Sequence, residues 1–264
     1  MNIVILAGDQ VRHRYFAQRI AQTHTVSGAV LEKKEDRRID RSGLTPPELE
    51  SVEWWERARD AADEKFFSAG AQEFDRRHLP TLTVETRHIN DENVCAWVRE
   101  RSPDLLVVFG TGLIKEPYLS AFSGRILNIH LGLSPYYRGS ATNLWPILNR
   151  ELEYIGTTVL FLDPGIDSGD IIHQGRPHIT ADDDPHTIGA KAIVIAADLM
   201  IKAIHEFQAG TAARVPQQAD VGRVYYRKNW GVPQIQLMHR LVTQEGVIAV
   251  YSRAPDSKTV VIVP

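Results

Sequence analysis

The sequence predicts an α/β fold, with a mostly parallel sheet flanked by helices and a smaller C-terminal appendage. Short apolar runs such as Asn2–Ala7 and Asp104–Phe109 are typical of strands that are buried on both faces of a sheet. Segments with helical periodicity alternate with these runs, which is the pattern of βαβ units. The length of 264 residues suits one large domain of this class with a small addition.

The first half of the chain opens with a strand, a helix and a second strand. Strands are expected at Asn2–Ala7, Thr25–Leu31, Leu82–Thr86 and Asp104–Phe109, and helices at Arg12–Thr23, after Thr45 and at Asp91–Arg101. The charge run Glu32–Arg41 indicates a solvated loop. Thr45 is a candidate N-cap with Pro46 at the first helical position and Glu48 in a capping box.

The helix after Thr45 carries an apolar stripe. Its members at helical spacing are Leu49, Val52, Trp55, Ala62 and Phe66. The Trp54–Trp55 pair could form an aromatic platform, but the periodicity favours a stripe that packs on the sheet.

The second half continues the alternation and then changes character. A short helix is expected at Pro117–Phe122, strands at Arg125–His130, Thr157–Leu162 and Ile171–Gln174, the end of a helix at Pro146–Arg150, and a long helix at Pro185–Ala209. Gly210 ends that helix. Beyond it lie the β-type pieces Arg223–Arg227 and Thr259–Val263 and the helical piece Val232–Thr243. We therefore expect a main domain over residues 1–210 and an appendage over 211–264.

Composition and local patterns exclude several classes. The net charge of −3 disfavours a dedicated nucleic-acid binder, because such proteins need a basic surface. Cys95, the single cysteine, cannot form a disulfide within the chain or a thiolate cluster, and we expect it to be a small, partly buried residue. His173 and His178 lack metal-site spacing, so no metal is expected.

We also expect neither a secretory signal nor a membrane-spanning segment. The first apolar run breaks at Gly8–Asp9 and has no basic residues before it, unlike a secretory signal. No stretch reaches the roughly 18 apolar residues of a membrane span. We therefore expect a cytoplasmic protein without membrane contact.

Polar residues stand where strands are expected to end. Asn128 and His130 are two residues apart, so on a strand their side chains share one face. Asp167 follows the strand Thr157–Leu162, and one crossover unit would bring the sites together at a common sheet edge, where such sheets bind ligands. A carboxamide, an imidazole and a carboxylate can stabilise an oxyanion and handle a proton. A structural histidine and a turn-forming aspartate remain open alternatives.

The surrounding motifs point to a family. Asn128-Ile-His130 is followed by Leu-Gly-Leu-Ser-Pro-Tyr-Tyr-Arg-Gly, and later by Asp163-Pro-Gly-Ile-Asp167-Ser-Gly-Asp-Ile-Ile-His-Gln174. This resembles the formyltransferases that use N10-formyltetrahydrofolate, whose core motif is Asn-x-His-x-x-x-x-Pro followed by an Asp-x-Gly loop. The resemblance is strong over residues 104–174 and extends in layout over 1–210. Gly132-Leu-Ser-Pro135 departs from the Ser-Leu-Leu-Pro of many members, which bears on loop contacts rather than on the trio.

The resemblance implies a Rossmann-like catalytic domain in which Asn128, His130 and Asp167 are catalytic. Asn128 would donate to the oxyanion, His130 would stabilise it or relay a proton from an attacking amine, and Asp167 would stabilise an imidazolium. Whether His130 or Asp167 accepts the proton is left open.

The resemblance also implies two loops around the formyl donor. Backbone groups of one loop would read the pterin ring and the second loop would close its other side; the residues are Phe109, Gly110, Thr111, Gly112, Leu113 and Ile114, and then Asp163, Gly165 and Ile166. The Gly-x-Gly at 110–112 could instead bind a dinucleotide, but it lacks the third glycine and the position in the first βα turn.

The acceptor amine divides this family, and the motif variant resembles members associated with amino sugars of bacterial surface polysaccharides such as the O-antigen of lipopolysaccharide. We therefore expect a nucleotide-linked amino sugar. Residues that could contact it are Arg12, His13 and Arg14 at a diphosphate, and Tyr136, Tyr137 and Arg138 at the sugar or base. For the first three, the alternative is the surface of a helix start.

Other acceptors and functions remain open. Glycinamide ribonucleotide, methionyl-tRNA and an amino-acid amine are alternative acceptors, although the 54 residues after Gly210 look short for a tRNA-binding domain. Tyr225, Tyr226 and Trp230 in this tail could contact a base, but we expect them to pack or to form a homodimer surface. A formyltetrahydrofolate hydrolase and a catalytically silent scaffold are the functions of other classes.

Overall fold

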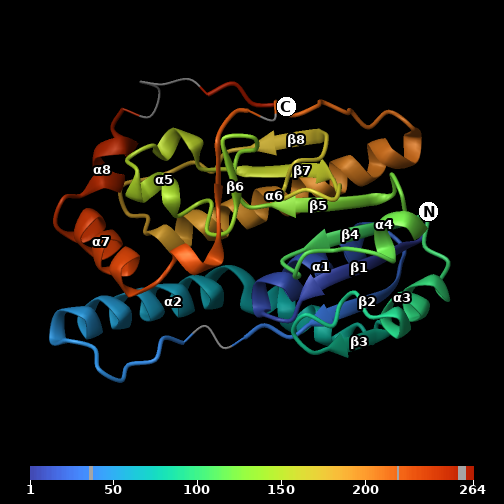
Figure 1. Cartoon of the computed structure of the whole chain (residues 1–264), viewed down its shortest axis with the longest axis horizontal. Helices are drawn as coiled ribbons and strands as arrows, with labels where there is room; N and C mark the ends of the chain where they lie inside the picture. Colours follow the sequence, from blue (N-terminus) through green and yellow to red (C-terminus); the bar gives the residue numbers. More distant parts are fainter. Residues whose placement is uncertain (36–37, 219, 255–259) are drawn as a thin grey trace.

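The computed structural model describes residues 1–35, 38–218, 220–254 and 260–264 (Figure 1). The strands are β1 (Ile3–Gly8), β2 (Val26–Glu32), β3 (Thr81–Val84), β4 (Leu105–Phe109), β5 (Ile126–His130), β6 (Tyr137–Gly139), β7 (Thr157–Phe161), β8 (Ile171–Gly175) and β9 (Arg223–Tyr225). The α-helices are α1 (Val11–Thr23), α2 (Pro46–Arg76), α3 (Glu92–Arg99), α4 (Tyr118–Ala121), α5 (Trp145–Leu148), α6 (Pro185–Ala209), α7 (Val232–Thr243) and α8 (Val247–Ser252). Two 3-10 turns are η1 (Leu152–Tyr154) and η2 (Arg227–Asn229).

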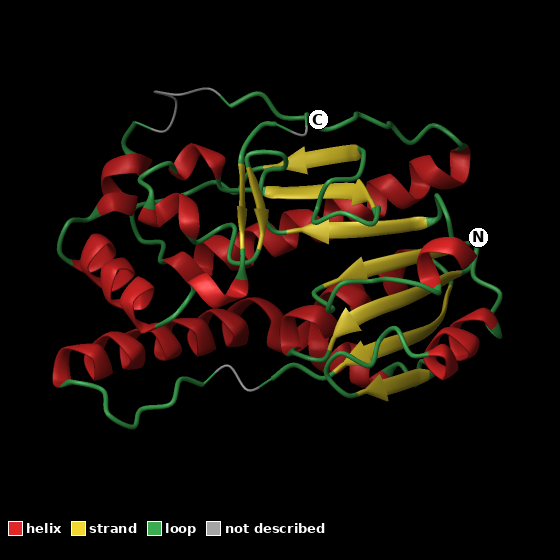
Figure 2. Cartoon of the chain, in the orientation of Figure 1, coloured by secondary structure: helices red, strands yellow, loops and turns green. Residues whose placement is uncertain are grey.

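The main sheet has seven strands in the order β3-β2-β1-β4-β5-β7-β8. The strands from β3 to β5 pair in parallel, and β7 is antiparallel to both β5 and β8. This arrangement confirms the expected α/β class with a mostly parallel sheet. The short strands β6 and β9 form a second, parallel ribbon that lies crosswise between the sheet and the helices α5, α7 and α8 (Figure 2).

Apolar strands at the centre of the sheet build two core layers. All six residues of β1 are buried, as the unbroken apolar run predicts for a strand covered on both faces. One cluster joins alternate sheet residues such as Ile5 and Val107 to α1, α2 and α6. The other joins Val4 and Leu106 to α3 and α4. Helices therefore flank the sheet on both faces.

The ends of the long helices follow their sequence signals. Thr45 and Glu48 form the expected capping box at the start of α2. Asp184 caps α6 by accepting from the backbone N–H groups of His186 and Thr187. Gly210 ends α6 in the left-handed conformation, with φ of 71°. The local signals thus defined both helices.

The stripe on α2 is more divided than expected. Val52, Trp55 and Ala62 are buried as predicted. Phe66 packs against the sheet core while only partly buried, and Phe67 and Phe74 are buried within that core. Trp55 packs on His186 and Trp230 with ring centroids 4.0 and 5.6 Å away, in a third core cluster with α5 and α7. The start of α2 therefore supports the C-terminal helices instead of the sheet.

Two expectations for loops and strands need correction. The run 32–41 is not wholly a solvated loop, because Glu32 ends β2 and is 1% exposed; residues 36–37 of this run lie outside the described part. No strand is formed at 260–263 of the expected piece 259–263, whose first residue is not described. Instead, Val263 exchanges hydrogen bonds with the backbone N–H and side-chain oxygen of Gln174.

The segment after α6 packs onto the rest of the molecule. Val215 forms a bridge with Ile171 of the edge strand β8, and β9 pairs with β6. The helix expected at 232–243 is α7, which packs on α2, whereas α8 was not predicted. The division at residue 210 therefore marks the end of a helix, and its functional meaning stays a prediction.

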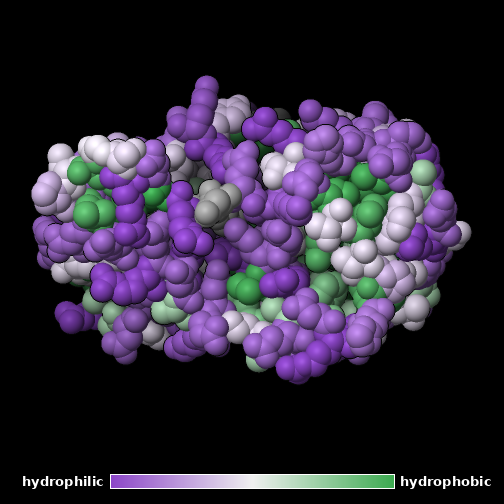
Figure 3. All heavy atoms as spheres, turned by 90° about the horizontal axis from the view of Figure 1, so that it is seen from below, coloured by the Kyte–Doolittle hydropathy of each residue, from purple (hydrophilic) through white to green (hydrophobic). Residues whose placement is uncertain are grey.

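The outer face seen from the side of α2 is mainly hydrophilic, with hydrophobic residues in separate patches (Figure 3). Within the described residues, no helix is both long and apolar enough to cross a membrane. The expected homodimer stays a prediction.

Candidate active site

The alternation of β5 aims two polar side chains at one face of the sheet. Leu127 and Ile129 point into the core formed with α1 and α6. Asn128 and His130 therefore point to the opposite face, toward the side that α3 and α4 cover farther along the strand. Asn128 is half-buried, and its carboxamide has no hydrogen-bond partner among the described residues. His130 is 4% exposed at the end of the strand.

Both ring nitrogens of His130 contact acceptors. Nδ1 lies 3.2 Å from Oδ2 of Asp167, and Nε2 lies 2.7 Å from the backbone carbonyl oxygen of Tyr137. The same Oδ2 accepts the backbone N–H of Gly139 at 2.9 Å. The Nε2 contact meets hydrogen-bond geometry, whereas the Nδ1 contact is a close approach to the carboxylate. The structure therefore brings the imidazole of His130 and the carboxylate of Asp167 together.

Asp167 reaches this position by a different route from the expected crossover. Because β7 runs antiparallel to β5, with Phe161 opposite Leu127 and Thr158 opposite His130, β7 ends beside the start of β5. The loop 162–170 therefore folds back along the sheet to bring Asp167 to His130. A crossover unit between the two sites was a wrong expectation, although the proximity it was meant to explain is present.

Sequence reasoning missed the residues that hold the connection after β5. Gln174 donates from Nε2 to the carbonyl of Ser134 at 2.6 Å and to Oγ1 of Thr158 at 3.1 Å. Thr158 in turn donates to the carbonyl of Gly132 at 2.7 Å. A Cβ at Gly132 would lie 2.5 Å from Nε2 of His130, so the close approach requires glycine. Only the position of Gln174 within the family motif pointed to these contacts.

The first expected donor loop follows β4. Phe109 and Ile114 are buried, Gly110 has φ of 70°, and Leu113 is 58% exposed. The N–H of Gly112 donates to Glu32 Oε2 at 2.6 Å, and Asn90 donates to the carbonyl of Leu113 at 2.9 Å. The loop is thus fixed by side chains from β2 and from the turn before α3, while an apolar side chain is presented to solvent. Thr111 bonds within the loop to the carbonyl of Gly112.

The second expected loop holds Asp167 in an unusual conformation. Asp163 accepts hydrogen bonds from the N–H of Gly165 and the hydroxyl of Ser168, which ties the start of the loop to its end. Ile166 is half-buried beside Asp167. Asp167 itself has φ of 49°, in the left-handed region that few non-glycine residues adopt. Such a conformation persists only where surrounding contacts fix it.

The residues expected at a diphosphate are engaged in packing. Arg12 pairs with Asp63 of α2 at 2.8 Å, and Arg14 lies 3.8 Å from Asp75. His13 is 3% exposed and packs edge-on against Phe109 with ring centroids 4.9 Å apart. These contacts fit the alternative of a helix start that packs on α2. Phosphate binding here stays a prediction.

The expected sugar and base contacts fall in an aromatic cluster. Tyr137 is buried and stacks on Tyr225 at 5.5 Å, and Tyr136 packs on Tyr154 at 5.1 Å. Burial raises the pKa of Tyr137, whose hydroxyl donates to Glu151 and accepts from Asn149.

The tail aromatics extend this cluster. Trp145 connects Tyr225 to Trp230, whereas Tyr226 is 52% exposed. Arg138 is half-buried on β6, without an acidic partner among the described residues. Of the residues expected at the acceptor, Arg138 is the one whose charge the described chain leaves uncompensated.

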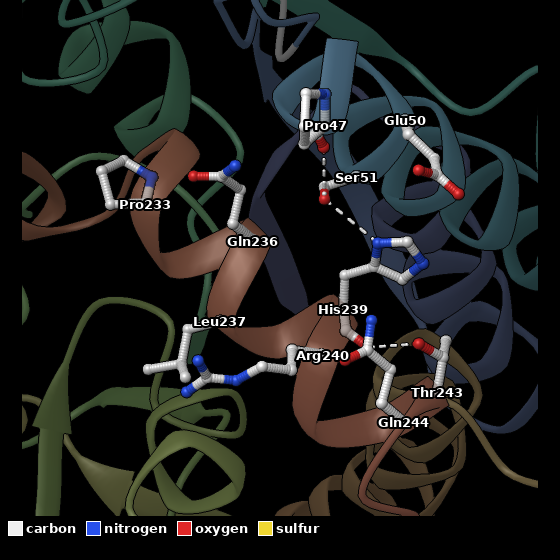
Figure 4. A pocket seen from close by; sticks show the side chains of 10 residues that line it. All are labelled: Pro47, Glu50, Ser51, Pro233, Gln236, Leu237, His239, Arg240, Thr243 and Gln244. Carbon is white, nitrogen blue, oxygen red and sulfur yellow. Dashed lines mark hydrogen bonds between the residues drawn. The ribbon is translucent and has the colours of Figure 1, made fainter. Parts of the chain in front are cut away.

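A separate groove of about 550 Å³ lies between the start of α2 and α7 (Figure 4). Ser51 and His239 face one another across it, with Oγ and Nδ1 3.0 Å apart. The Ser51 hydroxyl donates to the carbonyl of Pro47, so it accepts from the histidine and is not activated as a nucleophile. None of the expected site residues lines this groove.

The remaining chemically reactive residues fit structural roles. Cys95 is buried in the α3 cluster, and burial raises the pKa of its thiol. His173 pairs with Glu206 at 2.7 Å. Among the described residues, no group of three or more His, Cys, Asp or Glu side chains is placed to hold a metal ion.

Comparison with known proteins places these motifs in context. Residues 48–204 match the family model for formyl transferase. A methionyl-tRNA formyltransferase of Pelotomaculum thermopropionicum is 35% identical over 131 residues, which are 49% of this chain and 42% of that protein. The chain thus spans less than half the length of this curated relative.

Solved structures share the fold. Glycinamide ribonucleotide transformylase 1 of Symbiobacterium toebii matches with a TM-score of 0.59 at 20% identity, over 83% of this chain and 94% of that one. An N-formyltransferase of Helicobacter canadensis, in complex with folinic acid and dTDP-3-aminofucose, matches with a TM-score of 0.57 at 18% identity, over 91% and 80%. At these identities the likeness establishes the fold.

Proposed function

The chain belongs to the formyl transferase family, and from this premise we propose that it transfers a formyl group from N10-formyltetrahydrofolate to a primary amine. The observation that carries the proposal is the His130–Asp167 pair at 3.2 Å beside the unpartnered carboxamide of Asn128. These groups match the family motif.

The residues around this pair fit the formyl donor. The exposed Leu113 side chain offers an apolar surface for the flat pterin ring of the donor. Backbone groups of the loops 109–114 and 163–167 would form hydrogen bonds to that ring. Asn128 supplies a free amide donor to a carbonyl oxygen. When bound, the donor supplies an electrophilic formyl carbon. The chain's own residues then orient the donor and stabilise charge.

The proposed chemistry forms one bond and breaks another. The amine nitrogen bonds to the formyl carbon, the bond from that carbon to N10 breaks, and a proton passes from the amine to N10. Asn128 donates a hydrogen bond to the formyl oxygen as negative charge develops there. A protonated His130 ring stabilises the same negative charge, and Asp167 orients that ring.

We propose that Asp167, the more accessible of the two side chains, takes the proton from the amine. Its side chain is 17% exposed, whereas that of His130 is 3% exposed and has acceptors at both nitrogens. In its protonated form, a histidine has no lone pair that could accept the amine proton. We therefore assign proton removal from the amine to Asp167, directly or through one water molecule.

For the acceptor, we propose a nucleotide-linked amino sugar used for surface polysaccharide such as O-antigen. Support comes from the motif variant, from the net charge of −3, which is unfavourable for tRNA, and from the shared fold with an N-formyltransferase bound to dTDP-3-aminofucose. Arg138, which lacks an acidic partner among the described residues, suits an anionic group of such a substrate. The alternatives are glycinamide ribonucleotide, methionyl-tRNA, on which the matched curated relative acts by name, and an amino-acid amine.

An acceptor panel tests both parts of the proposal. The purified protein is incubated with N10-formyltetrahydrofolate and, in turn, nucleotide-linked amino sugars, glycinamide ribonucleotide, methionyl-tRNA or no amine. Formylation of an amino sugar alone supports the full proposal, and formylation of another amine would replace the acceptor. Rapid loss of the formyl group without any amine would identify a hydrolase.

A further inference from the structure

We propose that Gln217, which lies outside the family motif, is a positioning residue that holds the Asp167 loop in its active conformation. Its Nε2 donates to the carbonyl of Asp167 at 2.9 Å and to the carbonyl of Gly169 at 2.7 Å. The inference rests on the proposed function, because it concerns the geometry of the residue that we assign to proton removal.

The conformation of Asp167 explains why the loop needs such support. At φ of 49°, this residue lies in the left-handed region, which carries a steric cost for a residue with a Cβ although aspartate adopts it more often than most. Its carboxylate is held by His130 and by the N–H of Gly139. Its carbonyl is held by Gln217 and, at the longer distance of 3.3 Å, by the hydroxyl of Ser134. Gln217 therefore supplies the shorter of the two bonds that fix the backbone.

The amide orientation of Gln217 follows from its partners. Two carbonyl oxygens lie on the same terminal atom, so this atom must be the NH2 group; the opposite orientation would set an oxygen against two oxygens. In this orientation Oε1 is buried without a hydrogen-bond partner among the described residues. Leaving an acceptor unpaired costs free energy. This orientation leaves Oε1 unpaired but lets Nε2 donate both hydrogen bonds to the loop.

Gln217 is itself held between two backbone anchors. Val215 exchanges backbone hydrogen bonds with Ile171 of β8 at 2.8 and 3.0 Å. Downstream, the N–H of Arg223 donates to the carbonyl of Tyr136, and β9 pairs with β6. The same β6 carries the Tyr137 carbonyl that meets His130 and the Gly139 N–H that meets Asp167. The segment after α6 thus makes hydrogen bonds that help to fix the positions of the active-site residues.

The test compares Gln217→Glu with Gln218→Glu in the full chain. Gln217→Glu keeps the shape, removes both donors and places a carboxylate against two carbonyls, whereas Gln218→Glu adds the same charge at an exposed neighbour. We expect kcat for formyl transfer to fall about tenfold to a hundredfold in Gln217→Glu, with a KM for the donor changed much less. We expect backbone amide exchange within 163–170 to become roughly tenfold faster, while exchange in β1 is unchanged. Gln218→Glu should match the wild type in each measurement.

Gln217→Ala is the second variant in case the carboxylate prevents folding, since it removes the donors without adding charge. Wild-type kcat in both Gln217 variants, unchanged exchange within 163–170, or equal losses in Gln218→Glu would each overturn the proposal. Amide exchange needs no substrate, so it decides the role of Gln217 in holding the loop even if the wild type formylates no amine. That last result would overturn the proposed function and, with it, the catalytic meaning of the contact.

Discussion

Gly139 lies where the β6·β9 ribbon meets the active site, and replacing it with alanine tests both. A Cβ on this residue would lie 2.1 Å from the backbone carbonyl oxygen of Tyr225, and its φ is 94°. The neighbouring N–H of Ser140 donates to that same carbonyl at 2.8 Å. The N–H of Gly139 donates to Asp167. Relief of the clash therefore has to move β9 or β6 and weaken both hydrogen bonds.

The magnitude follows from these terms. The positive φ costs a residue with a Cβ about 1–2 kcal/mol, and the two hydrogen bonds contribute about 1 kcal/mol each. We therefore expect Gly139→Ala to lower the free energy of unfolding by about 3–4 kcal/mol. Because a donor to the Asp167 carboxylate is displaced, we expect kcat to fall by about tenfold or more.

Gly43→Ala is the matched control. Gly43 also has a positive φ, of 78°, but a Cβ there meets no atom within 4 Å. It should cost only the backbone term and leave kcat unchanged. Urea unfolding followed by tryptophan fluorescence gives the stabilities, and steady-state formyl transfer gives kcat. If both variants lose the same stability, or if Gly139→Ala keeps full kcat, the argument from close approach is refuted.

Three further predictions concern charge, helix propensity and pH. Asp167→Asn should lower kcat about a hundredfold or more with a nearly unchanged KM for the donor, because an amide carries no charge and offers one acceptor oxygen; an unchanged kcat in steady-state assays would contradict the assignment. Gly189→Ala should raise the unfolding free energy by about 0.5–1 kcal/mol, since Gly189 lies inside α6 and a Cβ there meets open space; a loss of stability in urea would speak against this. Burial and the neighbouring His205 lower the pKa of His24, so the unfolded chain binds this proton more readily and stability should decline as the pH falls below about 6.5. His24→Gln should weaken that decline between pH 7.5 and 5.5, values chosen to be about one unit either side of the usual histidine pKa, and an identical decline in the variant would show that other groups cause it.

Local signals predicted the elements that they describe. The apolar runs at β1 and β4, the capping box of Thr45 and Glu48, and the left-handed Gly210 lie where the sequence indicated. These features depend on a few neighbouring residues, on burial and on backbone hydrogen bonds at helix ends. Patterns of this range do not depend on how distant segments meet.

Local signals did not predict which distant segments of the chain pair with one another. The direction of β7 depends on which edge of β5 it joins, and an apolar strand reads the same in either direction. The three-residue strands β6 and β9 stabilise one another only when they meet, 86 positions apart for the pair Tyr137 and Arg223. Glu32, in a run of charges, is buried because the N–H of Gly112 and the N–H of Arg87 both donate to it.

The sequence by itself determined the fold class, the family and the identities of Asn128, His130 and Asp167 as a candidate trio, because the motif spacing is a local property of the chain. The tertiary structure decided how they meet: an antiparallel β7, a loop that folds back with Asp167 at φ of 49°, and Gln217 from beyond α6 on its backbone. The physical reason is that a hydrogen bond between residues 50 positions apart forms only after the chain between them has folded.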